Sequence, residues 1–173
     1  MRKKTGLCVS TRSREGGASE FNHEGVLGIS VYCGHRKGSS STSDLSESAI
    51  ESAVSAAISI AKHTSEDPFN GLADASLMAT DIPDLDLYHP GSLEPQYAID
   101  LALASEEAAL DYSDEITYCD GASYNSHQGL RVYGNSHGLL AGYPSSRHSL
   151  SCVTIAEKDG EMERDYEYSV SRY

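Results

Sequence analysis

The sequence predicts an α+β fold: two antiparallel β-meander regions with two main helices packed on the sheet. Runs of β-forming residues separated by turn residues fill residues 5–43 and 116–170. Between them, residues 44–64 and 95–111 repeat their apolar side chains at helical spacing. A chain of 173 residues is long enough for one hydrophobic core, so residues 1–173 are interpreted as a single α/β domain.

The first meander region is expected to contain four strands. The predicted strands cover residues 5–14, 18–23, 26–34 and 39–43. Gly16 and Gly17 are expected to break the run, and residues 34–38 to form a turn. Because no Gly-x-x-x-x-Gly-Lys-Ser/Thr string occurs, the glycines are interpreted as turn residues and not as a phosphate loop. The basic residues 2–4 are interpreted as a frayed, solvated end.

The helix predicted over residues 44–64 is amphipathic. Asp44 or Ser46 is a suitable N-cap, and the following apolar residues define the face that is expected to be buried. These residues are Ile50, Val54, Ala57, Ile58 and Ala61. The stripe is therefore interpreted as core.

The second helix is predicted from Pro95 to Asp111, because proline is favourable at the first helical position. Its expected buried stripe consists of Tyr97, Leu101, Ala104 and Ala108. Glu106 and Glu107 are expected to face away from that stripe.

Residues 65–94 contain three prolines and no sustained periodicity, so they are interpreted as a long connector with a short helical turn near 72–78. Its acidic residues and His89 raise the alternative of a metal cluster. The Ca²⁺-loop pattern with its central glycine and terminal glutamate is missing, and this favours an acidic, solvated loop.

The last third repeats short polar clusters between β-forming runs. The clusters are Asn125-Ser126-His127, Asn135-Ser136-His137 and Ser146-Arg147-His148. Asparagine, serine and glycine favour turns, so all three clusters are predicted to be reversals of a meander. Asp159-Gly160 is the plainest two-residue hairpin turn, and period-2 alternation follows it over residues 162–170.

His127, His137 and His148 raise the question of a metal site, because three ligands and a water make a catalytic zinc centre. Their spacings of ten and eleven residues do not place two ligands on one helical face, and no His-Glu-x-x-His string occurs. Histidines in or beside turns are the favoured interpretation, and no metal ligand is assigned.

Composition limits the function classes. The net charge of −13 argues against nucleic-acid binding and against anionic membrane surfaces. No 18-residue apolar segment is present, so a cytoplasmic protein without a membrane span is expected. The four cysteines, Cys8, Cys33, Cys119 and Cys152, form no Cys-x-x-Cys pair and are interpreted as reduced thiols.

Several strings together resemble the N-terminal part of the TldD/PmbA family, and in particular its PmbA (TldE) branch. They include Val9-Ser10-Thr11-Arg12, Arg36-Lys37-Gly38-Ser39, Pro83-Asp84-Leu85-Asp86, Gly134-Asn135-Ser136-His137-Gly138 and Ser146-Arg147-His148-Ser149. The resemblance spans essentially the whole chain. It implies an N-terminal α/β domain, with the family's C-terminal β-rich domain absent after Tyr173 and an upstream helical segment missing before Met1.

The resemblance also implies a function. In this family a TldD-like subunit carries the zinc-binding, peptide-cleaving site, and the PmbA branch resembles a partner that completes a heterodimeric metalloprotease. The chain is thus expected to be a non-catalytic module that holds no cofactor, with zinc in the partner subunit. Expected partners are a TldD-like subunit, a peptide substrate and a second copy of the chain. The candidate binding residues are Asn135, His137, Arg147 and His148.

Two alternatives come from other classes. One is an autonomous metal-dependent hydrolase that uses His127, His137 and His148. The other is a non-enzymatic protein-binding module related to gyrase or to an antitoxin partner, which the acidic charge would suit.

Overall fold

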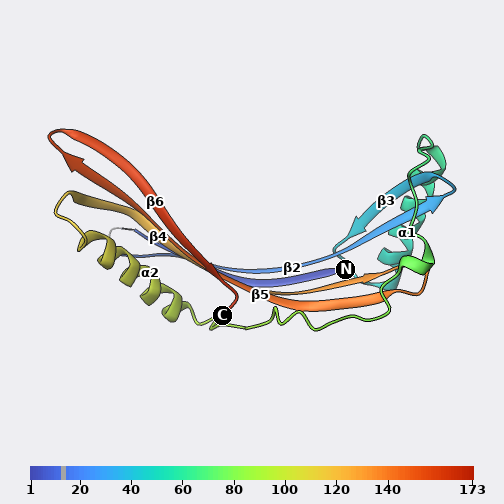
Figure 1. Cartoon of the computed structure of the whole chain (residues 1–173), viewed down its shortest axis with the longest axis horizontal. Coiled ribbons are helices and arrows are strands. Elements are labelled where there is room, and N and C mark those ends of the chain that lie inside the picture. Colours follow the sequence, from blue (N-terminus) through green and yellow to red (C-terminus); the bar gives the residue numbers. More distant parts are fainter. Residues whose placement is uncertain (13–14) are drawn as a thin grey trace. The chain divides into compact units, whose positions relative to one another are not determined.

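The computed structural model describes residues 1–12 and 15–173, and Figure 1 follows the chain through them by colour. The elements are β1 Arg2–Arg12, β2 Glu15–Cys33, β3 Arg36–Thr42, α1 Glu47–His63, the 3-10 helix η1 Ala75–Leu77, α2 Pro95–Leu110, β4 Ile116–Gly134, β5 Leu140–Lys158 and β6 Glu161–Ser171. The strands form a six-stranded sheet in the order β3-β2-β1-β4-β5-β6. The predicted α+β class, with two meander regions and two main helices, is confirmed.

Packing divides the chain into two compact units. Unit 1 comprises residues 1–3, 24–85 and 130–143, and unit 2 comprises residues 4–23, 86–129 and 144–173. The four long strands β1, β2, β4 and β5 each contribute residues to both units. That residues 1–173 form a single domain stays a prediction.

Two tight hairpins bear out the local turn signals. Between β5 and β6, Lys158 pairs with Glu161, and both central residues have positive φ, 53° at Asp159 and 81° at Gly160. Positive φ at both central positions defines a type I′ turn, for which Asp-Gly is a preferred sequence. The turn between β2 and β3 is shorter than predicted, because β3 already begins at Arg36.

Two of the three predicted reversals in the last third are wrong. Asn125–His127 lies inside β4, and Ser146–His148 lies inside β5; only Asn135–Gly138 forms a turn, in which the Asn135 N–H donates to Leu139 O at 3.0 Å. Polar residues can occupy mid-strand positions when a neighbouring strand supplies hydrogen-bond partners, and unit 2 supplies them here.

The predicted break at Gly16 and Gly17 is also wrong, since β2 runs through both residues. A Cβ on Gly17 would lie 2.0 Å from Ser10 O, so glycine is needed there for close approach of backbone and not for a turn. The end of the first predicted strand, residues 13–14, lies outside the described residues. Residues 2–4, predicted to be frayed, belong to β1.

In unit 1, α1 packs on β3 (Figure 1), and the buried residues of the helix are small. Ala53, Ala57 and Ala61 are buried, whereas the predicted anchors Ile50, Val54 and Ile58 are only half-buried. A Cβ on Gly38 of β3 would lie 2.0 Å from Ala57 O, so helix and strand backbones approach very closely. The predicted stripe is therefore fully buried only at its alanines, Ala57 and Ala61, because close approach selects alanine over larger side chains.

In unit 2, the buried side of α2 differs from the prediction. Ala98, Ala102 and Glu106 are fully buried, while Tyr97 is 48% exposed and Ala104 and Ala108 are exposed. The core next to this helix contains Leu7 and Val9 of β1, Tyr124 of β4 and Ala98. Full burial of a leucine or valine stabilises by about 1.5–3 kcal/mol, so β1 anchors this unit.

Candidate functional site

A buried serine–histidine cluster lies in unit 2, where Ser126 of β4 meets His148 of β5. The Ser126 hydroxyl lies 3.0 Å from His148 Nδ1, and the Tyr124 hydroxyl lies 3.4 Å from the same nitrogen. His148 Nε2 lies 3.0 Å from the backbone oxygen of His89. A carbonyl can only accept, so in the neutral ring Nε2 carries the hydrogen and Nδ1 accepts from the hydroxyl groups.

The cluster continues into the connector that precedes α2. Ser146 of β5 accepts from the His89 N–H at 2.8 Å, and its own N–H donates to Leu87 O at 2.8 Å. A Cβ on Gly91 would lie 2.7 Å from the His148 ring, so glycine allows the connector to pass directly over the histidine. His148 and Ser146 therefore hold residues 87–91 against β5.

Nucleophilic catalysis does not follow from the Ser126–His148 contact. An activated serine must reach a substrate carbonyl, and its base must be able to pass the proton on. Ser126 is 0% exposed, and both ring nitrogens of His148 already have partners inside the unit. The same burial raises the pKa of the Tyr124 hydroxyl above its usual range. The cluster is a buried polar network that positions backbone.

The other candidate residues lie elsewhere. His127 is next to Ser126 in β4, so alternation along the strand directs its side chain to the opposite face of the sheet from the His148 contact. There its ring occupies the space over Gly6, where an added Cβ would lie 2.1 Å from His127 Nδ1. His127 and His148 therefore do not converge.

Asn135 and His137 lie in the β4–β5 turn of unit 1. Asn135 Oδ1 accepts a hydrogen bond from the His137 N–H at 3.0 Å. The His137 side chain is exposed. Both residues line a hollow of about 1060 Å³ together with residues of β2 and the connector. Arg147 is exposed on β5. A binding role for Asn135, His137, Arg147 and His148 stays a prediction.

The residues present do not fit a zinc site. Within residues 1–12 and 15–173, no group of three or more His, Cys, Asp or Glu side chains is arranged to hold a metal ion. His148 would have to break a buried hydrogen bond to free a ring nitrogen, and His127 faces the other way. In the connector, His89 contacts Asp86 Oδ1 at 3.3 Å and stacks on Tyr173, as a local contact and not as part of such a group.

Unit 2 contains two further contacts that the sequence did not indicate, each with at least one buried partner. The Thr11 hydroxyl donates to Glu106 Oε1 at 2.5 Å, which joins β1 to α2. Cys119 and Cys152 lie on adjacent strands with their sulfurs 3.4 Å apart and are free thiols. Burial raises the pKa of Cys119 to about 11, so its thiolate is disfavoured. Ala98, Ala102 and Glu106 follow one another at intervals of four residues and therefore share one face of α2. This spacing is the sequence signal that could have predicted burial of the Glu106 carboxyl group.

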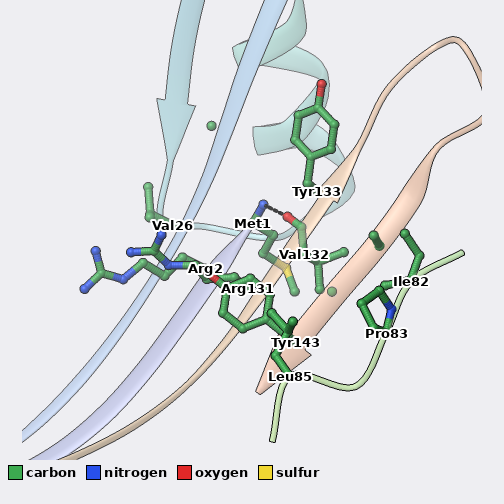
Figure 2. Close-up of a pocket in the computed structure, with 13 residues that line it drawn as sticks. Met1, Arg2, Val26, Ile82, Pro83, Leu85, Arg131, Val132, Tyr133 and Tyr143 are labelled. Carbon is green, nitrogen blue, oxygen red and sulfur yellow. Dashed lines mark hydrogen bonds between the residues drawn. The ribbon is translucent and has the colours of Figure 1, made fainter. Parts of the chain in front are cut away.

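Unit 1 contains an open apolar pocket of about 520 Å³, shown in Figure 2. It is lined by Met1, Arg2, Val26, Gly28, Ile82, Pro83, Leu85, Arg131, Val132, Tyr133, Ala141, Gly142 and Tyr143. Four strands and the connector contribute to it. No local pattern indicates such a pocket, because its residues come from segments far apart in the sequence.

Two family models match the chain. The PmbA/TldA metallopeptidase domain 1 matches residues 4–61, and the PmbA/TldA metallopeptidase central domain matches residues 88–172. The metalloprotease PmbA of Escherichia coli O157:H7 is 54% identical over 98% of the chain, and the metalloprotease PmbA homolog of Haemophilus influenzae is 55% identical over the same share. The chain spans 38% of the length of each relative.

Solved structures share the fold. A Bacteroides thetaiotaomicron protein described as a candidate modulator of DNA gyrase has a TM-score of 0.87 at 26% identity, over 99% of this chain and 40% of that one. TldE from Thermococcus kodakarensis has a TM-score of 0.78 at 14% identity, over 99% of this chain and 39% of that one.

A membrane-spanning helix is absent from the part of the chain that the structure describes, since its helices lack the necessary length and apolar character. On the two domain matches and the identity to PmbA proteins, the chain belongs to the PmbA/TldA metallopeptidase family.

Proposed function

We propose that the chain is the N-terminal module of a PmbA (TldE)-like subunit in a TldD/TldE-type zinc metalloprotease complex that processes or degrades peptides. The observation that carries this proposal is the 54% identity to a metalloprotease PmbA over 98% of the chain. The complex would act in the cytoplasm, in keeping with four cysteines that are free thiols.

Within that complex the module is non-catalytic, and the TldD-like subunit supplies the zinc. The arrangement of the histidines supports this division. His148 fixes the connector through both ring nitrogens, and His127 faces away from it. The module would instead contribute a rigidly held backbone and an exposed surface for contact with the metal-binding subunit.

Contact with the TldD-like subunit would use the exposed candidates His137 and Arg147, with Asn135 shaping the turn that presents His137. His148 would act indirectly, because its ring holds residues 87–91 in place. A second copy of the chain is the other partner expected of these surfaces.

The test is association of the purified chain with a purified TldD-like subunit, followed by sedimentation at matched concentrations. We expect a heteromeric species that contains both chains, and peptide cleavage only in samples that contain the TldD-like subunit. His137→Ala and Arg147→Ala should weaken association, whereas Lys158→Ala, which removes a charge paired with Glu115, should not. Absence of any heteromeric species, or cleavage by the chain alone, would contradict the proposal.

A second candidate is a binding module for DNA gyrase. It is favoured by one observation: the Bacteroides relative of the same fold is described as a candidate modulator of that enzyme. Sedimentation with purified gyrase in place of the TldD-like subunit separates the two candidates, because a complex with gyrase alone would favour this one.

A further inference from the structure

The pocket of unit 1 has two arginines side by side. Met1 and Val132 exchange both backbone hydrogen bonds, at 2.7 and 2.9 Å, and the first of these is the dashed line in Figure 2. In an antiparallel pair, the next residues along, Arg2 and Arg131, are then directly opposite and share one face of the sheet. Like charges in this position destabilise a sheet.

Within the described residues, no ion pair neutralises the charges of these two arginines. Neither Arg2 nor Arg131 takes part in the ion pairs formed among residues 1–12 and 15–173. The protein as a whole carries a net charge of −13, so two neighbouring arginines without an ion pair stand out against an acidic background. A bound anion would relieve the repulsion, and a carboxylate can bind guanidinium groups through two parallel hydrogen bonds.

The rest of the pocket is apolar and open. Val26 is 41% exposed, Ile82 47% and Leu85 52%, and Figure 2 shows these residues among those that line the pocket. Gly28 lies two residues after Val26, so it shares the same face, and a Cβ added to it would meet nothing within 4 Å. The pocket thus has room for an apolar group next to the arginine pair.

The connector wall selects a peptide as the occupant. Ile82 and Leu85 lie outside helices and strands, and no backbone hydrogen bond of either is formed within the described part of the chain. Their N–H and C=O groups are therefore available to an extended peptide, as those of a strand edge are. An acyl chain would leave these polar groups without partners.

We propose that this pocket binds the carboxyl-terminal end of an extended peptide with an apolar last residue. The terminal carboxylate lies between Arg2 and Arg131, and the last side chain fills the space over Gly28. That peptides are what this protein meets rests on the function proposed above. Binding of a peptide end would make the module a docking site for peptides, separate from the place where they are cut.

The test uses a fluorescently labelled hexapeptide that ends in leucine, titrated with the purified chain and followed by anisotropy. A free carboxylate should bind at least about tenfold more tightly than the carboxyl-terminal amide of the same peptide, because the amide loses the charge that the arginines recognise. A peptide that ends in aspartate should bind weakly, since it lacks the apolar last side chain.

Variants assign the binding to this pocket. Arg131→Gln should weaken binding of the free-carboxylate peptide about tenfold and abolish its preference over the amide. The matched control is Arg36→Gln, which removes the same charge from unit 1 at an arginine paired with Glu66. Gly28→Leu should fill the pocket and block binding, whereas Gly71→Leu, at a glycine outside this pocket with equally open space, should not. Urea unfolding midpoints identify any variant that loses binding only because it is misfolded.

Equal binding of acid and amide would overturn the proposal, as would unchanged binding in both Arg131→Gln and Gly28→Leu. Displacement of the peptide by decanoate at far lower concentration than by a second peptide would also overturn it in favour of an acyl chain. Association with the TldD-like subunit is measured separately, so peptide binding without that association would leave the pocket assigned and contradict only the proposed complex.

Discussion

The two units secure their helices by different means. In unit 1, α1 lies on β3 through small residues, with Gly38 directly against the backbone of Ala57. In unit 2, α2 and the connector are held by buried polar groups, the Thr11–Glu106 bond and the His148–His89 bond. Buried polar bonds are specific and costly to break, whereas close packing of small residues tolerates no added atom.

The difference extends to the surfaces. Unit 2 buries its serine and histidine, and their hydrogen bonds are completed internally. Unit 1 leaves apolar side chains and two opposed arginines exposed around a pocket. The contrast is that unit 2 holds the connector through buried hydrogen bonds, whereas the pocket proposed to bind a peptide end lies in unit 1.

The largest effect is expected in unit 2 from His148→Ala. It leaves the Ser126 hydroxyl and the His89 carbonyl without their partner and creates a cavity, so the free energy of unfolding should fall by about 3–4 kcal/mol. Urea unfolding followed by circular dichroism measures this. Loss of less than about 1 kcal/mol would mean that the buried network does not hold the connector.

Unit 1 should respond most to Gly38→Ala. The new Cβ would lie 2.0 Å from Ala57 O and 2.4 Å from Ala61 N, so α1 must move away from β3. We expect a loss of about 1–3 kcal/mol, the usual cost of overpacking. Gly25→Ala is the control, because its Cβ would meet only the Lys3 side chain at 4.0 Å. Hydrogen exchange should locate the change in α1 and β3; protection unchanged there would contradict the close-packing account.

The Cys119 thiol gives unit 2 a dependence on alkaline pH. Burial raises its pKa from 9.0 to about 11 in the folded state, so the unfolded chain loses this proton first. The stabilisation is fully present below pH 9 and is lost as pH rises from 9 through 11. Unfolding midpoints between pH 8 and 11 should fall less steeply in Cys119→Ser than in the original chain. Parallel slopes in the two proteins would show that this thiol titrates normally.

The smallest effects are expected at the exposed candidates. His137→Ala and Arg147→Ala should each change the free energy of unfolding by less than about 0.5 kcal/mol, because neither side chain is buried. His137, Arg147 and His148 all come from the serine and histidine clusters of the sequence. The stability losses of the three alanine variants can therefore be compared directly. A large loss at His137 would remove the distinction between the two units.

Local signals predicted the elements that depend on local chemistry. The two helices, Pro95 at the start of α2 and the Asp159-Gly160 turn all follow from neighbouring residues, whereas the predicted strands at 18–23 and 26–34 are one strand, β2. The buried faces were predicted less well. Hydrophobicity alone favours Ile50 and Tyr97, whereas the packed structure also buries Ala53 and the hydrogen-bonded Glu106, which were not predicted to be buried.

Non-local pairing explains why the candidate sites could not be predicted from the sequence. In the sequence, Ser126 and His148 have the composition of turn residues. In the structure, pairing of β4 with β5 brings them together in the core. The sequence predicted that Arg2 belongs to a frayed basic end. In the structure, β1 pairs with β4 and Arg2 lies opposite Arg131. The family resemblance was visible in short strings spread over the chain, but these strings do not show which residues touch.

The central claim is that this chain does not itself hold the zinc. Its most direct test is elemental analysis of the zinc content of the purified chain after rinsing with a chelator. The account predicts a value near zero per chain, because His127 and His148 do not converge and His148 is held inside unit 2 by its own hydrogen bonds. A value near one zinc per chain, lost in His148→Ala, would contradict it and make the autonomous metal-dependent hydrolase the leading account.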